Sequence, residues 1–199
     1  THVHEAGVSY EQFMLLDEMV NSGELILGIY AMLFPTIENI NFARNNGHYL
    51  HKNLSVRSFK MLMDGALGSR GACLLSHYSD MPGEYGFLLM SETDMLAHTK
   101  EALSLGYQVN SHCIGDSANR LLLKHYDSLL ANEVDHRWRI EHAQVVAAND
   151  IELFSKSGVI PSIQPTHAVS DFRWAHNRLG EERLQTAYAY QTLLDERQM

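Results

Sequence analysis

The sequence predicts an α/β fold in which helices cover a parallel β-sheet. Short apolar segments of strand length alternate with longer helical segments along the chain, the pattern of a parallel sheet with helical crossovers. Residue types that begin and end helices stand at the expected boundaries. With 199 residues, 45% of them hydrophobic, the chain is long enough for one domain with a real core. Nothing indicates a linker, so one unit is expected from 1 to 199.

The first half of the chain contains three expected strands and one helix. They are a strand at 2–8, a helix at 9–22, a strand at 25–33 and a strand at 56–63. Ser9 is a suitable N-cap for the helix, and Gly23 is a suitable end. The stretches 34–54 and 64–92 are expected to be long loops, and long ordered loops often carry function.

The second half contains three more strands, which makes six, and four helices. In order they are a helix at 93–106, a strand at 107–114, a helix at 116–132, a strand at 136–145, a helix at 147–158, a strand at 158–164 and a helix from about 180 to 199. Thr93 and Asp116 are the expected N-caps of the first two helices, and Gly106 and Gly158 are expected to end helices.

Charge and composition exclude several classes of function. The net charge is −9 and the basic residues are scattered, so no nucleic-acid partner is expected. No apolar run is long enough to cross a membrane, and the start does not resemble a signal peptide. Cys73 and Cys113 are expected as reduced thiols, which favours a cytoplasmic location. Because the chain begins with Thr1, we expect it to be a piece of a longer protein.

Lys60 is an unusual residue for the interior of an expected strand. Alternation places Lys60 and Ser58 on one face of the strand and the apolar Phe59 on the other. A buried Lys is costly unless it is paired or chemically altered. It could ligate metal after adding carbon dioxide to form a carbamate, or it could act as a Schiff-base nucleophile in an enzyme without metal. Without a function, it would reach solvent or pair with a carboxylate.

His112 and His142 each stand near the end of an expected strand. His112 shares a face with Asn110, and two polar residues on an inward face are unlike a packed core. His142 ends the segment RIEH, and imidazole is a common ligand for zinc and similar ions. Either histidine alone could be a satisfied core residue. Together with Lys60 they have the layout of a metal site at one edge of a parallel sheet.

Three further residues are candidates for contact with a substrate. Gln164 and His167 lie in the segment QPTHA after the next strand, and an ordinary polar loop would explain them equally well. Arg70 lies in a glycine-rich loop that could hold an anionic group. The glycine spacing of that loop is not that of a phosphate-binding P-loop.

Segments spread over nearly the whole chain resemble those of the amidohydrolase superfamily, in the family's order. The resemblance is greatest to its YtcJ-like branch, also called the amidohydrolase 3 family, which includes N-substituted formamide deformylase. The matching segments are HVHEAGVS, IYAML, FKMLMDGALGSRGA, SHCIGDSANR, RIEHAQ and SIQPTHAVSD. Each segment is weak evidence alone, whereas the ordered set is specific.

This resemblance implies a partial (β/α)8 TIM barrel, about strands two to seven, with its site at the C-terminal ends of the strands. Lys60, His112 and His142 would be metal ligands on strands four, five and six, and related enzymes often carboxylate the Lys. The cofactor would be one or two divalent ions, with zinc the first expectation. His2 and His4 fall on strand two, so they are not expected to be the family's first ligand pair.

The resemblance also implies what lies outside these residues. The first ligand pair would precede Thr1, the proton-shuttling Asp would follow Met199, and a small β-sandwich domain would be absent. The intact protein would hydrolyse a carbon–nitrogen bond of a small non-peptide amide with a metal-activated water. The isolated fragment would be inactive, and its open strand edges could lead to self-association. The alternative is a barrel-derived regulatory or binding protein that has lost catalysis.

Overall fold

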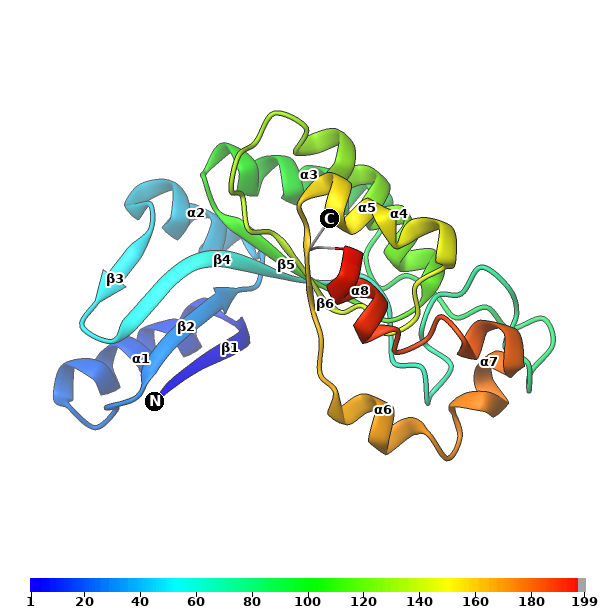
Figure 1. The fold of residues 1–199 in the computed structure, drawn as a ribbon. Helices are drawn as coiled ribbons and strands as arrows, with labels where there is room; N and C mark the ends of the chain where they lie inside the picture. The colour runs from blue at the N-terminus through cyan, green and yellow to red at the C-terminus, as the bar shows by residue number, and fades with distance from the viewer. Residues whose placement is uncertain (197–199) are drawn as a thin grey trace. The chain divides into compact units, whose positions relative to one another are not determined.

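The computed structural model describes residues 1–196 of the chain, which form two compact units (Figure 1). The first unit comprises 1–61 and 95–110, and the second comprises the remaining described residues. The strands follow the order β1-β2-β4-β5-β6-β7, and β3 pairs antiparallel with β4. The pairs β1–β2, β2–β4 and β6–β7 are parallel. The predicted α/β class with a parallel sheet is therefore confirmed.

The first unit begins with a strand, a helix and a second strand, as predicted. Its elements are β1 (His2–Val8), α1 (Tyr10–Ser22), β2 (Gly28–Leu33), α2 (Ile37–Asn46), β3 (Tyr49–His51), β4 (Leu54–Leu62), most of α3 (Glu92–Ser104) and the first half of β5 (Gln108–Cys113). Ser9 forms a capping box with Gln12 at the start of α1, and Gly23 ends the helix in the left-handed conformation.

The stretch 34–54 was predicted to be a loop, and that prediction is wrong. It contains α2 and β3, which the sequence signals poorly because α2 is largely polar. Tertiary hydrogen bonds stabilise α2 instead. The buried Asn39 side chain donates to the carbonyl oxygens of Val8 and Phe34 at 3.0 and 2.8 Å, so it ties α2 to the ends of β1 and β2.

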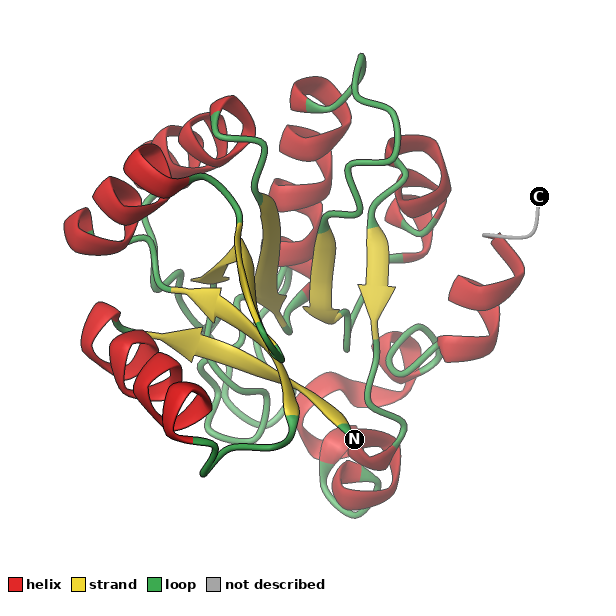
Figure 2. Cartoon of the chain, turned by 90° about the vertical axis from the view of Figure 1, so that its left-hand side faces the viewer, coloured by secondary structure: helices red, strands yellow, loops and turns green. Residues whose placement is uncertain are grey.

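The second unit contains the end of β5 and the elements that follow it. Its elements are α4 (Asp116–Leu129), β6 (Arg139–His142), a 3₁₀ turn (Ala148–Asp150), α5 (Glu152–Ser157), β7 (Ile160–Ser162), α6 (Thr166–Asp171), α7 (Ala175–Leu184) and α8 (Tyr190–Glu196). Helices are red and strands yellow in Figure 2. The strands predicted at 136–145 and 158–164 are shorter than expected. The single helix predicted from about 180 to 199 is wrong in part, because that range contains the end of α7 and all of α8 with a non-helical segment at 185–189 between them. Its last residues, 197–199, lie outside the described residues.

Two helix starts also differ from the prediction. The Ser91 hydroxyl accepts the N–H of Asp94 at 3.1 Å, so Ser91 rather than Thr93 caps the start of α3. The N-cap of α4 is Gly115 rather than Asp116. Asp116 accepts the backbone N–H of Leu75 at 2.9 Å, so it holds a loop segment against the start of α4.

The long connection 64–92 packs into the core of the second unit. That core contains Leu67, Ala72, Leu74, Tyr78, Ile114, Val145, Leu179 and Ala187. The connection is therefore ordered by burial, although it has no helix or strand of its own among its residues. None of the helices in residues 1–196 is long and apolar enough to cross a membrane.

Candidate metal centre

His112 lies on the face of β5 that turns away from α4. The neighbouring residue Ser111 is fully buried, and its hydroxyl lies 2.8 Å from the hydroxyl of Tyr126 on α4. Because side chains alternate along a strand, His112 points to the opposite face. Its backbone is held as well, since Met63 donates its N–H to the His112 carbonyl at 3.0 Å.

His142 ends β6 and lies directly beside His112. The two imidazole rings are 4.6 Å apart between centroids and meet edge to face at 73°. The backbone leaves β6 with positive φ at both His142 (79°) and Ala143 (42°). A non-glycine residue in this region stores of order 1–3 kcal/mol of strain, and such residues concentrate at functional sites. The predicted neighbourhood of the two histidines is thus present within the second unit.

Gln164 fixes the orientation of the His142 ring. Its amide nitrogen donates to the carbonyl of Ser162 at 3.0 Å, and its amide oxygen lies 2.6 Å from Nδ1 of His142. The amide oxygen can only accept, so Nδ1 of His142 carries the proton and Nε2 carries the lone pair. Histidines that bind metal commonly donate their second N–H to an oxygen in this way. The lone pair on Nε2 of His142 is the kind of donor that a divalent cation binds.

His167 belongs to the same cluster. It stands in the first turn of α6, and its ring lies 5.4 Å from the ring of His142. Its Nδ1 atom is buried and has no hydrogen-bond partner among the described residues. The structure therefore brings together four of the predicted site residues, His112, His142, Gln164 and His167.

Asp64, which the sequence did not single out, is a fully buried carboxylate beside His112. One oxygen accepts the N–H of Ile114 at 2.9 Å, and the other accepts those of Gly115 and Cys73 at 2.8 and 2.9 Å. Burial raises the pKa of Asp64 to about 6, and the three backbone N–H donors partly oppose that rise. Its Oδ1 lies 3.7 Å from Nε2 of His112.

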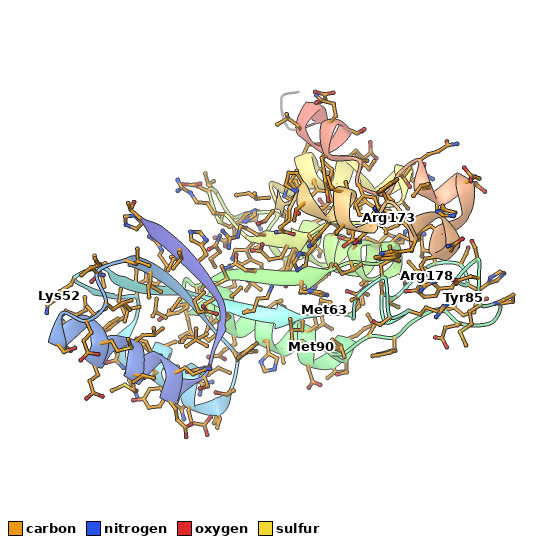
Figure 3. All side chains as sticks on the ribbon, turned by 90° about the horizontal axis from the view of Figure 1, so that it is seen from below. Lys52, Met63, Tyr85, Met90, Arg173 and Arg178 are labelled. Atoms are coloured by element: carbon orange, nitrogen blue, oxygen red, sulfur yellow. The ribbon has the colours of Figure 1, made fainter. Side chains whose placement is uncertain are left out.

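Arg70 lies in an ion pair rather than among the histidines. Its guanidinium donates two hydrogen bonds to Asp80, at 3.1 and 2.9 Å. Arg178 of α7 pairs with the same carboxylate and also donates to the Gly68 carbonyl at 3.2 and 3.1 Å. Figure 3 shows Arg178 beside the loop that carries Tyr85. Hydrogen bonding from Arg70 lowers the pKa of Asp80. A contact of Arg70 with substrate stays a prediction.

The backbone around Arg70 takes the unusual course that the glycines predicted. Arg70 itself has φ of 60°. A Cβ atom on Gly65 would lie 3.0 Å from the Cα of Gly71, so the two ends of the turn approach more closely than side chains would permit. The turn is closed by the Gly65 N–H, which donates to the Gly71 carbonyl at 3.1 Å.

Lys60 lies on β4 in the first unit. It is 4% exposed, and Ser58, on the same face of the strand, is fully buried. Its burial fits the predicted inward face, whereas its role as a ligand stays a prediction. The part of the chain that the structure describes contains no group of three His, Cys, Asp or Glu side chains arranged to hold a metal ion. His112 and His142 therefore supply two donors, and a complete site needs others.

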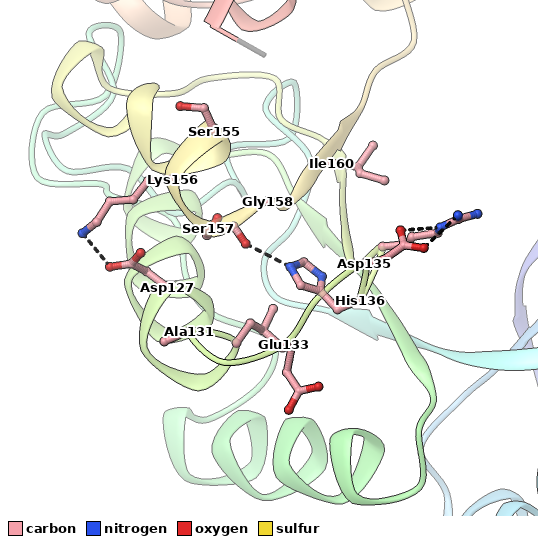
Figure 4. A pocket seen from close by; sticks show the side chains of 12 residues that line it. Asp127, Ala131, Glu133, Asp135, His136, Ser155, Lys156, Ser157, Gly158 and Ile160 are labelled. Atoms are coloured by element: carbon pink, nitrogen blue, oxygen red, sulfur yellow. Dashed lines mark hydrogen bonds and ion pairs between the residues drawn. The ribbon is translucent and has the colours of Figure 1, made fainter. Parts of the chain in front are cut away.

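A pocket of about 520 Å³ lies at the other ends of β6 and β7 (Figure 4). Ile160, the first residue of β7, lines it, as does His136, which precedes β6. His136 contacts the Ser157 carbonyl through Nε2 at 2.9 Å and accepts the Trp138 N–H on Nδ1 at 3.0 Å, so both ring nitrogens are occupied. None of the predicted site residues lines this pocket.

Comparison with known proteins places the chain in a family. The family described as "Amidohydrolase family" matches residues 2–198. The chain belongs to this amidohydrolase family. Over 137 residues it is 33% identical to a Bacillus subtilis (strain 168) protein named as amidohydrolase YtcJ, covering 69% of the chain and 26% of that protein. The YtcJ-like resemblance is thereby confirmed.

Two further proteins similar to this amidohydrolase chain are much longer than it. It is 36% identical over 152 residues to the Arabidopsis thaliana protein LONG AFTER FAR-RED 3, covering 75% of the chain and 26% of that protein. An uncharacterized metal-dependent hydrolase from Pyrococcus horikoshii has a similar fold, with a TM-score of 0.85 and 28% identity over 98% of this chain and 38% of the other. The chain spans about a quarter of the curated relatives that it matches. The predicted partial TIM-barrel fold is confirmed by this structural match.

Proposed function

We propose that this chain contributes the metal-binding histidines of a hydrolase that acts on a non-peptide carbon–nitrogen bond. The observation that carries the proposal is the pair His112 and His142, with the lone pair of His142 directed to Nε2 by Gln164. The amidohydrolase family and the metal-dependent hydrolase with the same fold support the assignment. Within this proposal the substrate is a small amide-like molecule and the cation is zinc or a similar divalent ion.

The chain's own residues have separable roles in this proposal. His112 and His142 provide imidazole donors at the ends of adjacent strands, and Gln164 holds the second ring in place. His167 stands beside them with a buried ring nitrogen, so it is proposed to contact the substrate together with Gln164, and Arg70 to contact an outer part of it. When bound, a divalent cation supplies acidity to a water molecule and polarises a carbonyl group.

Lys60 is proposed as a further ligand, after carboxylation. The support is its burial on a strand face, where a charged ammonium is costly, together with the family resemblance. The proton-shuttling Asp and the remaining ligands are proposed to lie in other parts of a longer protein. The isolated chain is therefore proposed to bind a cation weakly and to have little or no hydrolytic activity.

Cation binding by the chain itself tests the proposal. Co²⁺ is titrated into the chain and followed by its visible absorption, with His112→Asn and His142→Asn compared with wild type. Each variant should weaken binding by at least about 100-fold, more than the loss of an outer-shell partner causes. His176→Asn is the matched control, because His176 is an exposed histidine of the same unit. Equal Co²⁺ affinity in wild type and in both site variants would contradict the proposal.

The same Co²⁺ titration distinguishes the proposed hydrolase from the alternative, a barrel-derived binding protein that has lost catalysis. A barrel-derived binding protein without catalysis would show no Co²⁺ affinity that depends on His112 or His142.

Self-association through the sheet edges is a separate proposal. It is supported by β1, which is last in the strand order and carries the exposed residues His2 to Ala6. Light scattering that shows a monomer at all concentrations would contradict it.

A further inference from the structure

The buried carboxylate of Asp64 connects two segments of the chain by hydrogen bonds. It stands directly after β4, at the start of the 64–92 connection, and accepts three backbone N–H groups. Two of these donors, Ile114 and Gly115, form the turn that immediately follows β5 and therefore follows His112. The third donor, Cys73, lies nine residues further along the connection. One side chain thus joins the glycine-rich loop to the turn that carries His112.

Close backbone packing also holds the glycine-rich loop against the turn that follows His112. The carbonyl oxygen of Cys73 accepts the N–H groups of Ser117 and Ala118 at 3.1 and 3.4 Å, in the first turn of α4. Residue 115 is glycine, and a Cβ atom there would overlap the Cys73 carbonyl. The Met63 N–H donates to the His112 carbonyl, and the Leu89 N–H donates to the Met63 carbonyl, so the backbone is also held on the other side of Asp64.

The carboxylate also faces the His112 ring. Oδ1 of Asp64 lies 3.7 Å from Nε2 of His112, and the Asp64 side chain is fully shielded from solvent. This distance is longer than a hydrogen bond, but an anionic oxygen this close still favours the ring tautomer that carries its proton on Nε2. In that tautomer Nδ1 carries the lone pair. The preference complements His142, where Gln164 selects the opposite nitrogen.

We infer that Asp64 is a positioning residue for His112, setting both the place of its backbone and the nitrogen that it offers to a cation. The inference rests on the proposed function, in which His112 is a ligand. A carboxylate behind a ligating histidine raises the basicity of the ring and fixes its orientation, and its loss typically weakens metal binding by about 10- to 100-fold.

Asp116 provides a matched control for a purely structural role. It is also a buried carboxylate of the β5–α4 turn, and it also holds the connection 64–92, by accepting the Leu75 N–H at 2.9 Å. The carboxylate that lies 3.7 Å from the His112 ring is that of Asp64. Asp64→Asn and Asp116→Asn therefore each replace a buried carboxylate that holds the loop, and only the first removes a charge that faces the histidine.

The test combines two measurements on the chain. Long-range ¹H–¹⁵N NMR of the imidazoles reports the tautomer of His112, and a Co²⁺ titration reports affinity. We expect wild-type His112 to carry its proton on Nε2. Asp64→Asn should mix the tautomers and weaken Co²⁺ binding about 10- to 100-fold, whereas Asp116→Asn should change neither. Wild-type His112 protonated on Nδ1 would overturn the inference even if Asp64→Asn does not fold.

Three other outcomes are informative and distinct. If Asp116→Asn weakens Co²⁺ binding as much as Asp64→Asn, loop attachment alone explains the effect and the inference is overturned. If His112→Asn leaves Co²⁺ affinity unchanged, the proposed function fails. If His112→Asn weakens binding and Asp64→Asn does not, the positioning role alone fails.

Discussion

The backbone of Gly115 lies against the carbonyl of Cys73 so closely that no side chain fits between them. Gly115 has φ of −78°, an ordinary value for any residue, so the requirement for glycine comes from space alone. The contact joins the connection 64–92 to the start of α4.

Gly115→Ala should therefore destabilise the chain strongly. Because the opposing atom is backbone rather than a flexible side chain, relief requires the loop to move, and we expect a loss of about 3 kcal/mol or more in the free energy of unfolding. Urea denaturation followed by circular dichroism measures it. Gly83→Ala is the control: Gly83 has φ of 90° but nothing within 4 Å of a Cβ, so only backbone strain of about 1 kcal/mol is expected. Equal losses in both variants would contradict the steric account.

Asp80 should make the attachment of α7 dependent on pH. It pairs with Arg70 and Arg178, and its pKa is lowered. A lowered folded-state pKa means that the stabilisation is present above the ordinary aspartate pKa of about 3.9 and is lost as the pH falls through the lower folded value. Hydrogen exchange of the Ser79 N–H, which donates to the Arg178 carbonyl at 2.9 Å, should accelerate specifically in that acidic range.

Asp80→Asn should abolish this pH dependence and cost about 1 kcal/mol or less at neutral pH. Asp135→Asn is a matched control, since Asp135 pairs with Arg137 through two hydrogen bonds at 2.7 and 2.9 Å but joins residues only two apart in sequence. It should leave the exchange of Ser79 unchanged. The idea fails if wild type and Asp80→Asn respond identically to acid.

Gln164 should control cation affinity through His142. Gln164→Leu removes the acceptor for the Nδ1 proton and should weaken Zn²⁺ binding about 10- to 100-fold by calorimetry, whereas Gln164→Glu keeps an acceptor and should retain most of the affinity. Gln191→Leu is a control, because Gln191 is an exposed residue of α8 whose side chain donates to Asp195 of the same helix. Unchanged affinity in Gln164→Leu would show that the ring needs no such support.

Lys60 should make cation binding sensitive to bicarbonate. If Lys60 ligates as a carbamate, added bicarbonate should raise Co²⁺ affinity in wild type, and Lys60→Met should remove that response and lower affinity by about tenfold or more, which corresponds to about 1.4 kcal/mol. Lys100→Met, at an exposed position on α3, should behave as wild type. A bicarbonate response that persists in Lys60→Met would exclude carboxylation at this residue.

The sequence predicted the strands well because their signals are local. Apolar runs bounded by caps and glycines located the strands and α1, where Ser9 and Gly23 act as expected. The helices α2 and α6 were missed, and α7 was predicted only from about residue 180 onward, because long-range contacts hold them. Gly180 interrupts α7 with φ of 71°, and Arg183 of that helix donates to the carbonyls of Ser76 and His77 at 2.9 Å. No pattern along the chain reveals such bonds in advance.

The sequence could predict those site residues that lie at the ends of strands. His112 and His142 lie at the ends of β5 and β6, Gln164 and His167 follow β7, and the four residues meet because parallel strands end together. Asp64 was missed because its burial and its three backbone donors depend on how the loop folds back. The one available signal was its place directly after a strand and before Gly65, where a carboxylate at a strand end could have been flagged.

Imidazole NMR during Zn²⁺ addition tests the central claim most directly. With ¹⁵N-labelled histidine in the chain, the account predicts that the ring nitrogens of His112 and His142 shift together and at one stoichiometry, while those of exposed His176 do not move. Zn²⁺ that shifts other histidines and leaves His112 and His142 unchanged would contradict it.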